Sequence, residues 1–185
     1  TFSFLWFTYL GTQIGEDFVA TNAILINLVF LSAFILDAYA FSTEGIVGYS
    51  LGKKDLNLFK NIVKNSFILS SISGLIISII FFFTYNLVIN LMSDINEIRE
   101  LSSSYAVWLI ILPVISSFCY QFDGIFIGAS QTKELRNAMI FSVFSYLLIS
   151  ILLIKFLFNT GIWISLCIFM ILRAISLFYY LDKIY

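Results

Sequence analysis

The stretch FILDAYAFSTEGIVGYSLGKKD, residues 34–55, places two acids inside one long apolar segment that ends at Gly-Lys-Lys. The acids, Asp37 and Glu44, are seven residues apart, almost two turns at about 3.6 residues per turn, so both carboxyl groups point to one side of a helix, roughly 10 Å apart along it. Burying a carboxylate at bilayer depth costs at least about 2.5 kcal/mol, so an acid there usually faces a cavity or a partner and has a function. The alternative is a structural pair of acids, satisfied by Ser, Thr or Tyr of a neighbouring helix.

The composition predicts an all-α protein that crosses a membrane several times. Hydrophobic residues make up 61% of the 185 positions and charged residues 11%, whereas soluble domains contain about 45–50% apolar and about 25% charged residues. The net charge of −1 indicates no basic surface for nucleic acid. The chain has no His, and Cys119 and Cys167 stand alone in apolar runs, so the commonest general base and the usual metal-ligand spacings are missing. We therefore expect no enzyme activity, no metal and no bound cofactor.

Six apolar segments follow one another along the chain, measured against the roughly 20 residues that cross a bilayer. The first, from Thr1 to about Ile14, is too short and is predicted to be the end of a truncated helix. The amphipathic sequence LNLFKNIVKN, residues 56–65, is expected to lie along the membrane surface, and the acidic sequence SDINEIRE, residues 93–100, to form a loop. We find no second domain, so residues 1–185 are predicted to form one bundle. Its other spans are expected at about 18–52, 67–92, 106–128 and 138–158, and from a tight turn at 159–161 to about Leu181.

Basic residues mark one side of this predicted bundle. The cluster Lys53–Lys64, the pair Lys133 and Arg136, and Lys183 fall on the same side if the spans alternate in direction. Because Lys and Arg flank the cytoplasmic ends of membrane helices, this side and the C-terminus are predicted to be cytoplasmic. Arg173, midway in the last span, is expected to extend to this interface, with pairing to a buried acid as the alternative.

A second informative stretch, CYQFDGIFIGASQTKELRNAM at residues 119–139, adds a third acid, Asp123, in apolar surroundings. Asp37, Glu44 and Asp123 on two helices are typical of a site for a proton, a sodium ion or an organic cation. Since protonation and substrate binding can exclude each other, such a site can exchange one for the other when it opens to one side of the membrane at a time. Weaker candidates for the lining of a cavity are the rings of Tyr39 and Tyr120 and the amides of Gln13, Asn22 and Asn27, which can equally bridge helices.

Glycines and one proline predict how the helices pack. Glycines three or four residues apart let a second backbone approach closely, and a proline removes a backbone hydrogen bond and can kink a helix. The packing candidates are Gly45, Gly48 and Gly52 in the second segment, and Gly124, Gly128 and Pro113 in the fourth.

At LDAYAFSTEGIVGYSLGKKD, residues 36–55, and FDGIFIGASQTKELRNAM, residues 122–139, the chain resembles the MATE (multidrug and toxic compound extrusion) family, and specifically its DinF-like branch. The resemblance implies one lobe of a transporter with twelve transmembrane helices in two six-helix lobes. On this basis residues 1–185 are the C-terminal lobe, helices seven to twelve, with helix seven clipped. The partners implied are the lipid bilayer, the absent N-terminal lobe of the same polypeptide and small organic, cationic substrates, in a bacterial inner membrane.

The resemblance also implies a function and some of its residues. Members export organic cations and other toxic compounds in exchange for protons or sodium ions. Asp123 matches a tenth-helix carboxylate that belongs to a cation site in the NorM-like branch, which implies a sodium ion there. That branch also uses a seventh-helix glutamate, which FSFLWFTYLGTQIG at residues 2–15 lacks, so Asp37 and Glu44 are the local alternatives. In DinF-like members the proton-coupling aspartate is expected on the first helix, which is not in this chain.

Two other functions compete with the exporter. A flippase for lipid-linked precursors, from the wider superfamily, is expected to carry buried Arg and Lys for phosphates, whereas the intramembrane charges here are mainly acidic. An intramembrane aspartyl protease would use two carboxyls that share one proton, but its Tyr-Asp and Gly-x-Gly-Asp motifs are missing: Asp37 follows Ile-Leu and Asp123 follows Gln-Phe. A chain that only packs against its other lobe, with no activity alone, is a third interpretation.

Overall fold

A computed structural model describes residues 2–181 and 184, and it contains no strand among them. The described residues form an all-α bundle, as predicted. The elements are α1 (Phe2–Thr12), α2 (Glu16–Gly52), α3 (Leu56–Met92), α4 (Asn96–Ser104), α5 (Val107–Gly128) and α6 (Thr132–Tyr180). Among the described residues, α2, α3, α5 and α6 are long and apolar enough to cross a membrane.

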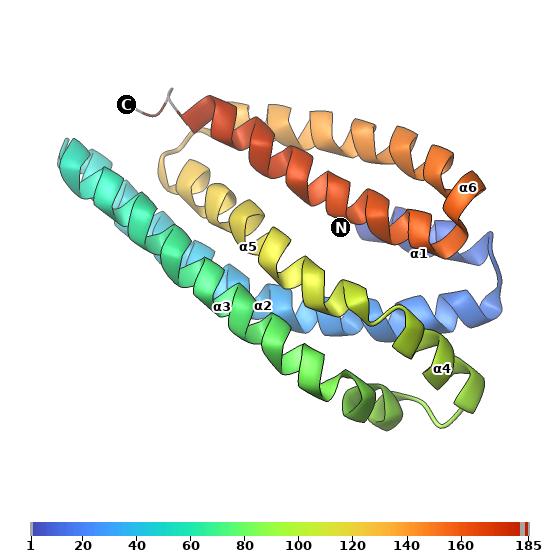
Figure 1. Ribbon diagram of the computed structural model, residues 1–185. Helices are drawn as coiled ribbons and strands as arrows, with labels where there is room; N and C mark the ends of the chain where they lie inside the picture. Colours follow the sequence, from blue (N-terminus) through green and yellow to red (C-terminus); the bar gives the residue numbers. More distant parts are fainter. Residues whose placement is uncertain (1, 182–183, 185) are drawn as a thin grey trace.

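The helices α2 and α3 form a long hairpin (Figure 1), and each is 37 residues long. Asp55 begins α3, because its carboxylate accepts a hydrogen bond from the backbone N–H of Leu58 at 2.9 Å. Residues 56–65, which were predicted to lie along the membrane surface before the third span, are therefore the first turns of the same helix as that span. No Gly or Pro interrupts the chain between this cap and the membrane span, and an established helix lengthens by one hydrogen bond per added residue.

The acidic sequence between α3 and α5 is also more ordered than predicted, because most of it is the helix α4. Ile98 is buried, so this short helix packs an apolar side chain inward. Arg99 closes the connection from α3: its Nε donates to Ser93 O at 2.5 Å, and its Nη2 donates to Asn90 O at 3.1 Å. The prediction of a loop over residues 93–100 is thus correct only for its first residues.

The helix α6 contains both the fifth and the sixth predicted segment. Its backbone leaves the helical conformation at Phe158, where φ is 49° and ψ is −131°, and the two arms of α6 run back along each other (Figure 1). A Cβ on Gly161 would come 2.5 Å from the carbonyl oxygen of Leu153, so only glycine permits this approach. The six predicted apolar segments correspond to α1, α2, α3, α5 and the two arms of α6.

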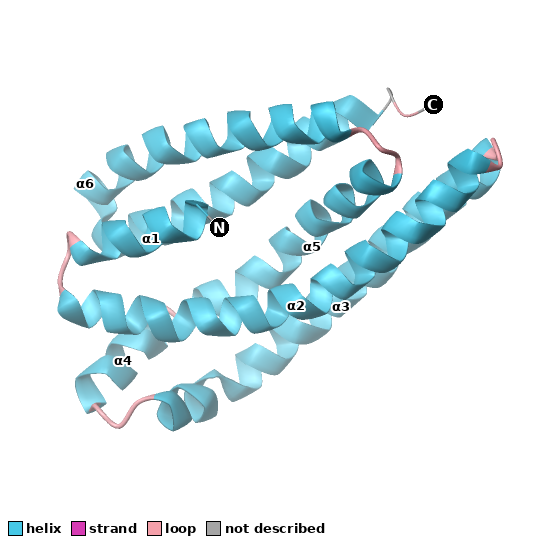
Figure 2. Ribbon diagram, turned by 180° about the vertical axis from the view of Figure 1, so that it is seen from behind, coloured by secondary structure: helices cyan, strands magenta, loops and turns pink. Residues whose placement is uncertain are grey.

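The loops with the predicted cytoplasmic charges lie at one end of the bundle. Figures 1 and 2 both show the α2–α3 loop, the α5–α6 loop and the C-terminal end of α6 at the same end of the bundle. Lys53 and Lys54 belong to the first of these loops, and Lys133 and Arg136 follow the second. Lys183 lies outside the described residues. The arrangement agrees with alternating spans, and the assignment of this end to the cytoplasm stays a prediction.

Candidate functional site

Close contact between α2 and α5 determines where the acids lie. A Cβ on Gly124 would collide with the backbone of Ala40, and a Cβ on Gly128 would collide with the backbone of Glu44. Gly48 faces the same crossing, since its Cβ would lie 3.3 Å from the carbonyl oxygen of Gly128. The two helices therefore touch backbone to backbone, as small residues four apart allow.

The other two packing candidates of α2 take no part in this contact. Gly45 and Gly52 are exposed, and an added Cβ would meet nothing within 4 Å at either position. Within the described chain, neither of them fulfils the predicted packing role.

This crossing brings one acid of each helix together. Asp123 directly precedes Gly124, and Asp37 lies three residues, or almost one turn, before Ala40. The two carboxylates interact electrostatically. Nearby, the hydroxyl of Thr43 donates a hydrogen bond of 2.9 Å to Oε1 of Gln121, a further polar link between α2 and α5.

Arg173, from the second arm of α6, completes the cluster. Its Nη2 lies 2.6 Å from Oδ2 of Asp123, and the side chains of Arg173 and Asp123 are 15% and 13% exposed. Asp37 also interacts electrostatically with Arg173. The expectation that Arg173 extends to the membrane interface is wrong, because it makes the alternative contact, a pair with a buried acid. We refer to Asp37, Asp123 and Arg173 as the charge cluster.

The remaining acid and the two tyrosines lie at different places relative to the charge cluster. Glu44 lies two turns beyond Asp37 on α2, where its backbone contacts Gly128, so it is not part of the charge cluster. Tyr120 lies on α5 three residues, or almost one turn, before Asp123. Tyr39 instead lines a groove between α2 and α3, together with Asn61 and Asn65.

The predicted amides lie in the first half of α2 or in the turn before it, ten or more residues before Asp37. Asn22 is buried, and its Nδ2 donates to Oδ1 of Asn159 at 2.6 Å. In return, Nδ2 of Asn159 and Nε1 of Trp163 donate to Oδ1 of Asn22 at 3.1 and 2.9 Å. Asn22 and Asn27 also line a small pocket between α1 and α2, whereas Gln13 is exposed. Asn22 therefore bridges helices, the alternative role considered for it.

Replacing Asn22 by Leu is expected to lower the free energy of unfolding by about 2 kcal/mol, because three hydrogen bonds inside a membrane bundle are lost at about 0.6 kcal/mol each. The change is measured by thermal unfolding of the purified protein in detergent. Asn27→Leu is the matched control, since Asn27 is an exposed amide of the same helix, and it is expected to stay within about 0.5 kcal/mol of the wild type. Equal losses in both variants would contradict a specific bridging role.

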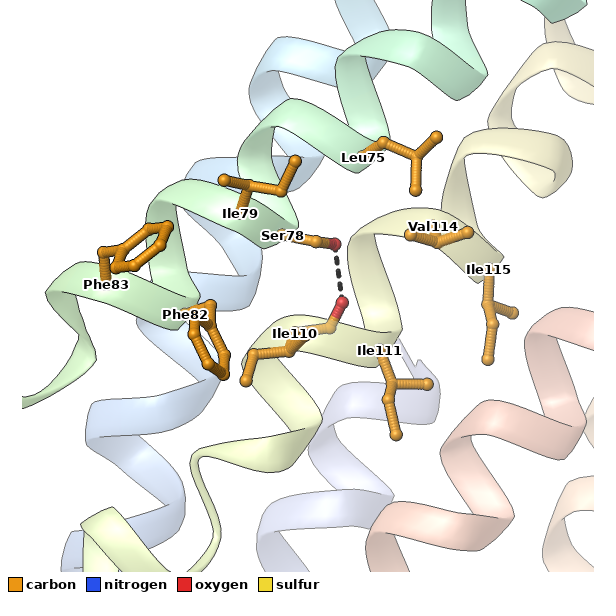
Figure 3. Close-up of a pocket in the computed structure, with 9 residues that line it drawn as sticks. All are labelled: Leu75, Ser78, Ile79, Phe82, Phe83, Ile110, Ile111, Val114 and Ile115. Carbon is orange, nitrogen blue, oxygen red and sulfur yellow. Dashed lines mark hydrogen bonds between the residues drawn. The ribbon is translucent and has the colours of Figure 1, made fainter.

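Three small residues of α3 pack against the backbone of α5 around Pro113. The sequence analysis did not identify them as packing residues. The hydroxyl of Ser78 donates to the carbonyl oxygen of Ile110 at 2.5 Å (Figure 3), and a Cβ on Gly74 would come 2.9 Å from the carbonyl oxygen of Pro113. One turn further, Ser70 donates to Ser117 O at 3.4 Å. The spacing of four residues between Ser70, Gly74 and Ser78 could have identified this packing face of α3 from the sequence.

The groove drawn in Figure 3 lies beside this contact and is almost entirely apolar. Besides Ser78, aliphatic and aromatic side chains of α3 and α5 line it, among them Phe82, Ile110 and Val114. It offers no carboxylate to a cation. Of the places considered so far, the charge cluster is therefore the one whose chemistry suits a cation.

Comparisons with known proteins agree with the resemblance found in the sequence. A family model described as MatE matches residues 1–155, a range that contains Asp37 and Asp123. DNA damage-inducible protein F of Escherichia coli (strain K12) is 32% identical over 170 residues, which are 92% of this chain and 37% of that protein. The chain thus spans little more than a third of the length of this relative. The chain belongs to the MatE family, the MATE transporters that its two acid-bearing sequences resemble.

Proposed function

We propose that this chain is the C-terminal lobe of a secondary active exporter that exchanges organic, cationic compounds for protons or sodium ions by alternating access. The observation that carries the proposal is the charge cluster, whose members come from α2, α5 and α6 in a bundle whose buried residues are mostly apolar. Family membership supports transport as the general activity.

The formal charge of the cluster explains how it would couple export of an organic cation to entry of a proton or sodium ion. Asp37 and Asp123 each carry one negative charge and Arg173 one positive charge, so the cluster has a formal charge of −1. A charge is costly at bilayer depth, so the cluster favours the arrival of one positive charge. A proton, a sodium ion or an organic cation can each supply it, and the presence of one disfavours the others. This competition turns binding into exchange.

A second lobe of the same polypeptide would supply the opposite wall of the cavity. The chain spans 37% of its relative, and alternating access requires two lobes that rock around a shared midplane site. We further propose that the pair lies in a bacterial inner membrane with the C-terminus in the cytoplasm, in agreement with the shared end of the Lys-bearing loops.

The competing functions fit the cluster less well. An aspartyl protease needs two carboxyls that share a proton, whereas Asp123 is bound to the guanidinium of Arg173. A flippase for phosphate-bearing lipids needs a net positive cavity. Arg173 is a buried cation, but the two acids outweigh it.

The test is transport of a fluorescent organic cation by the full-length protein in liposomes, under an imposed proton or sodium gradient. Asp37→Asn and Asp123→Asn are each expected to lower the rate at least about tenfold, a loss of about 1.4 kcal/mol or more. Glu44→Gln is the matched control and is expected to keep the wild-type rate within about twofold, because Glu44 lies outside the cluster. The gradient that drives transport identifies the coupling ion.

Two outcomes would count against the exporter. If neither gradient moves any cation, the protein has another cargo, and lipid-linked substrates are the next to be assayed. If both aspartate variants transport at the wild-type rate while inserting normally, the cluster is structural.

A further inference from the structure

The ion pair between Arg173 and Asp123 is incomplete. Only one contact joins them, from Nη2 to Oδ2 at 2.6 Å, although guanidinium and carboxylate groups often form two parallel hydrogen bonds. The other carboxylate oxygen, Oδ1 of Asp123, and Nε of Arg173 are both buried without a hydrogen-bond partner among the described residues. A buried pair contributes well to stability only when its remaining donors and acceptors are satisfied. This pair therefore keeps unused polar atoms that a ligand can engage.

Arg173 has a second acidic neighbour available. Asp37 interacts electrostatically with Arg173, and the three groups come from three different helices, α2, α5 and α6. When a cation binds Asp123, the negative charge of Asp37 still acts on Arg173, without a direct ion pair between them. No charge is then left buried without an opposite charge, which would otherwise cost several kcal/mol.

We infer that Arg173 is a tethered cation that limits the substrate to one positive charge. This inference rests on the proposed function. With Arg173 present, the cluster has a formal charge of −1 and is neutralised by a monocation. Without Arg173 the formal charge is −2, and a dication becomes the better match. Arg173 is thus a specificity-determining residue, and the substrate class is organic monocations.

The alternative is that the pair only fastens α5 to α6. In that case, removing Arg173 weakens the protein and lowers the binding of all substrates alike. The two interpretations differ in the ratio between substrates of different charge, so a matched pair of substrates separates them.

The experiment compares ethidium, a monocation, with propidium, which has the same ring system and one additional quaternary ammonium group. Binding of each dye to the purified full-length protein in detergent is measured by fluorescence. The wild type is expected to prefer ethidium, and Arg173→Gln is expected to shift the ratio of dissociation constants at least about tenfold toward propidium. Arg136→Gln, which removes an exposed arginine outside the cluster, is expected to leave the ratio unchanged.

A second variant keeps the test decisive if Arg173→Gln does not fold. Asp123→Asn alone brings the formal charge of the cluster to zero and is expected to lose ethidium binding. Adding Arg173→Gln to it restores the charge of −1, leaves no broken ion pair, and is expected to recover ethidium binding to within about threefold of the wild type. A merely structural pair instead predicts that the single and the double variant bind ethidium equally well per folded molecule, because the orphaned guanidinium then alters stability alone.

The results distinguish this inference from the proposed function. If the wild type transports no cation and binds neither dye, the exporter itself is wrong. If Asp123→Asn abolishes ethidium transport, but Arg173→Gln leaves the dye ratio unchanged and restores nothing, the exporter stands and the role given to Arg173 is overturned.

Discussion

Replacing Arg173 by Met is expected to lower the free energy of unfolding by about 3–5 kcal/mol, because the carboxylate of Asp123 is then left buried without its partner. Both side chains are largely shielded from solvent, and the loss of one member of a buried ion pair costs more than the pair contributes. Thermal unfolding of the purified protein in detergent measures the loss.

The double variant Asp123→Asn/Arg173→Met gives the control for this prediction. It removes both charges, and a buried pair replaced by neutral groups of similar size is often nearly neutral in stability. We expect it to be more stable than Arg173→Met. Arg136→Met, at an exposed arginine, is expected to change stability by less than about 0.5 kcal/mol. Additive losses from the two single variants would show that the pair is not coupled.

Replacing Gly124 by Ala is expected to destabilise the protein by about 3 kcal/mol, at the upper end of the cost of overpacking. The new Cβ would collide with the backbone of Ala40, and backbone atoms within a helix cannot rotate away as a side chain can. The two helices must separate, which also moves Asp37 away from Asp123. We therefore expect cation transport by the protein that remains folded to fall as well.

Gly45→Ala is the matched control on the opposing helix. An added Cβ at Gly45 meets nothing within 4 Å, and alanine favours a helix over glycine by about 1 kcal/mol. Its stability is expected to be unchanged or higher. If both alanine variants unfold at the same temperature, the close contact between α2 and α5 does not hold the bundle together.

The sequence predicted the spans well, because the length and composition of an apolar run are properties of the run alone. Its boundaries were harder to predict. The cap at Asp55 merges the stretch 56–65 into α3, and the buried Ile98 makes a helix of an acidic loop. In the first case a local hydrogen bond of one side chain decides the local structure, and in the second the burial of one side chain does.

The spacing of residues in the sequence could not identify the partners of the site residues. Asp37 and Glu44 share one side of α2, yet they lie at different levels of the crossing: Gly124, next to Asp123, contacts Ala40, whereas Glu44 lies at the level of Gly128. Spacing along one helix indicates which side a residue faces, and it does not indicate which helix lies there. For the same reason the sequence marked Arg173 as unusual without identifying Asp123 as its partner.

The second arm of α6 is attached to the rest of the bundle in two chemically different ways. Near its start, Asn159 and Trp163 are bonded to Asn22 through neutral amide and indole groups, and ions do not compete strongly for such bonds. Ten residues beyond Trp163, or about 15 Å along the helix, Arg173 forms an ion pair with Asp123. Under the proposed function, a cation that binds Asp123 weakens the ion pair and leaves the amide and indole hydrogen bonds intact. The second arm of α6 then keeps a fixed attachment near Asn159 while its contact at Arg173 responds to the bound cation.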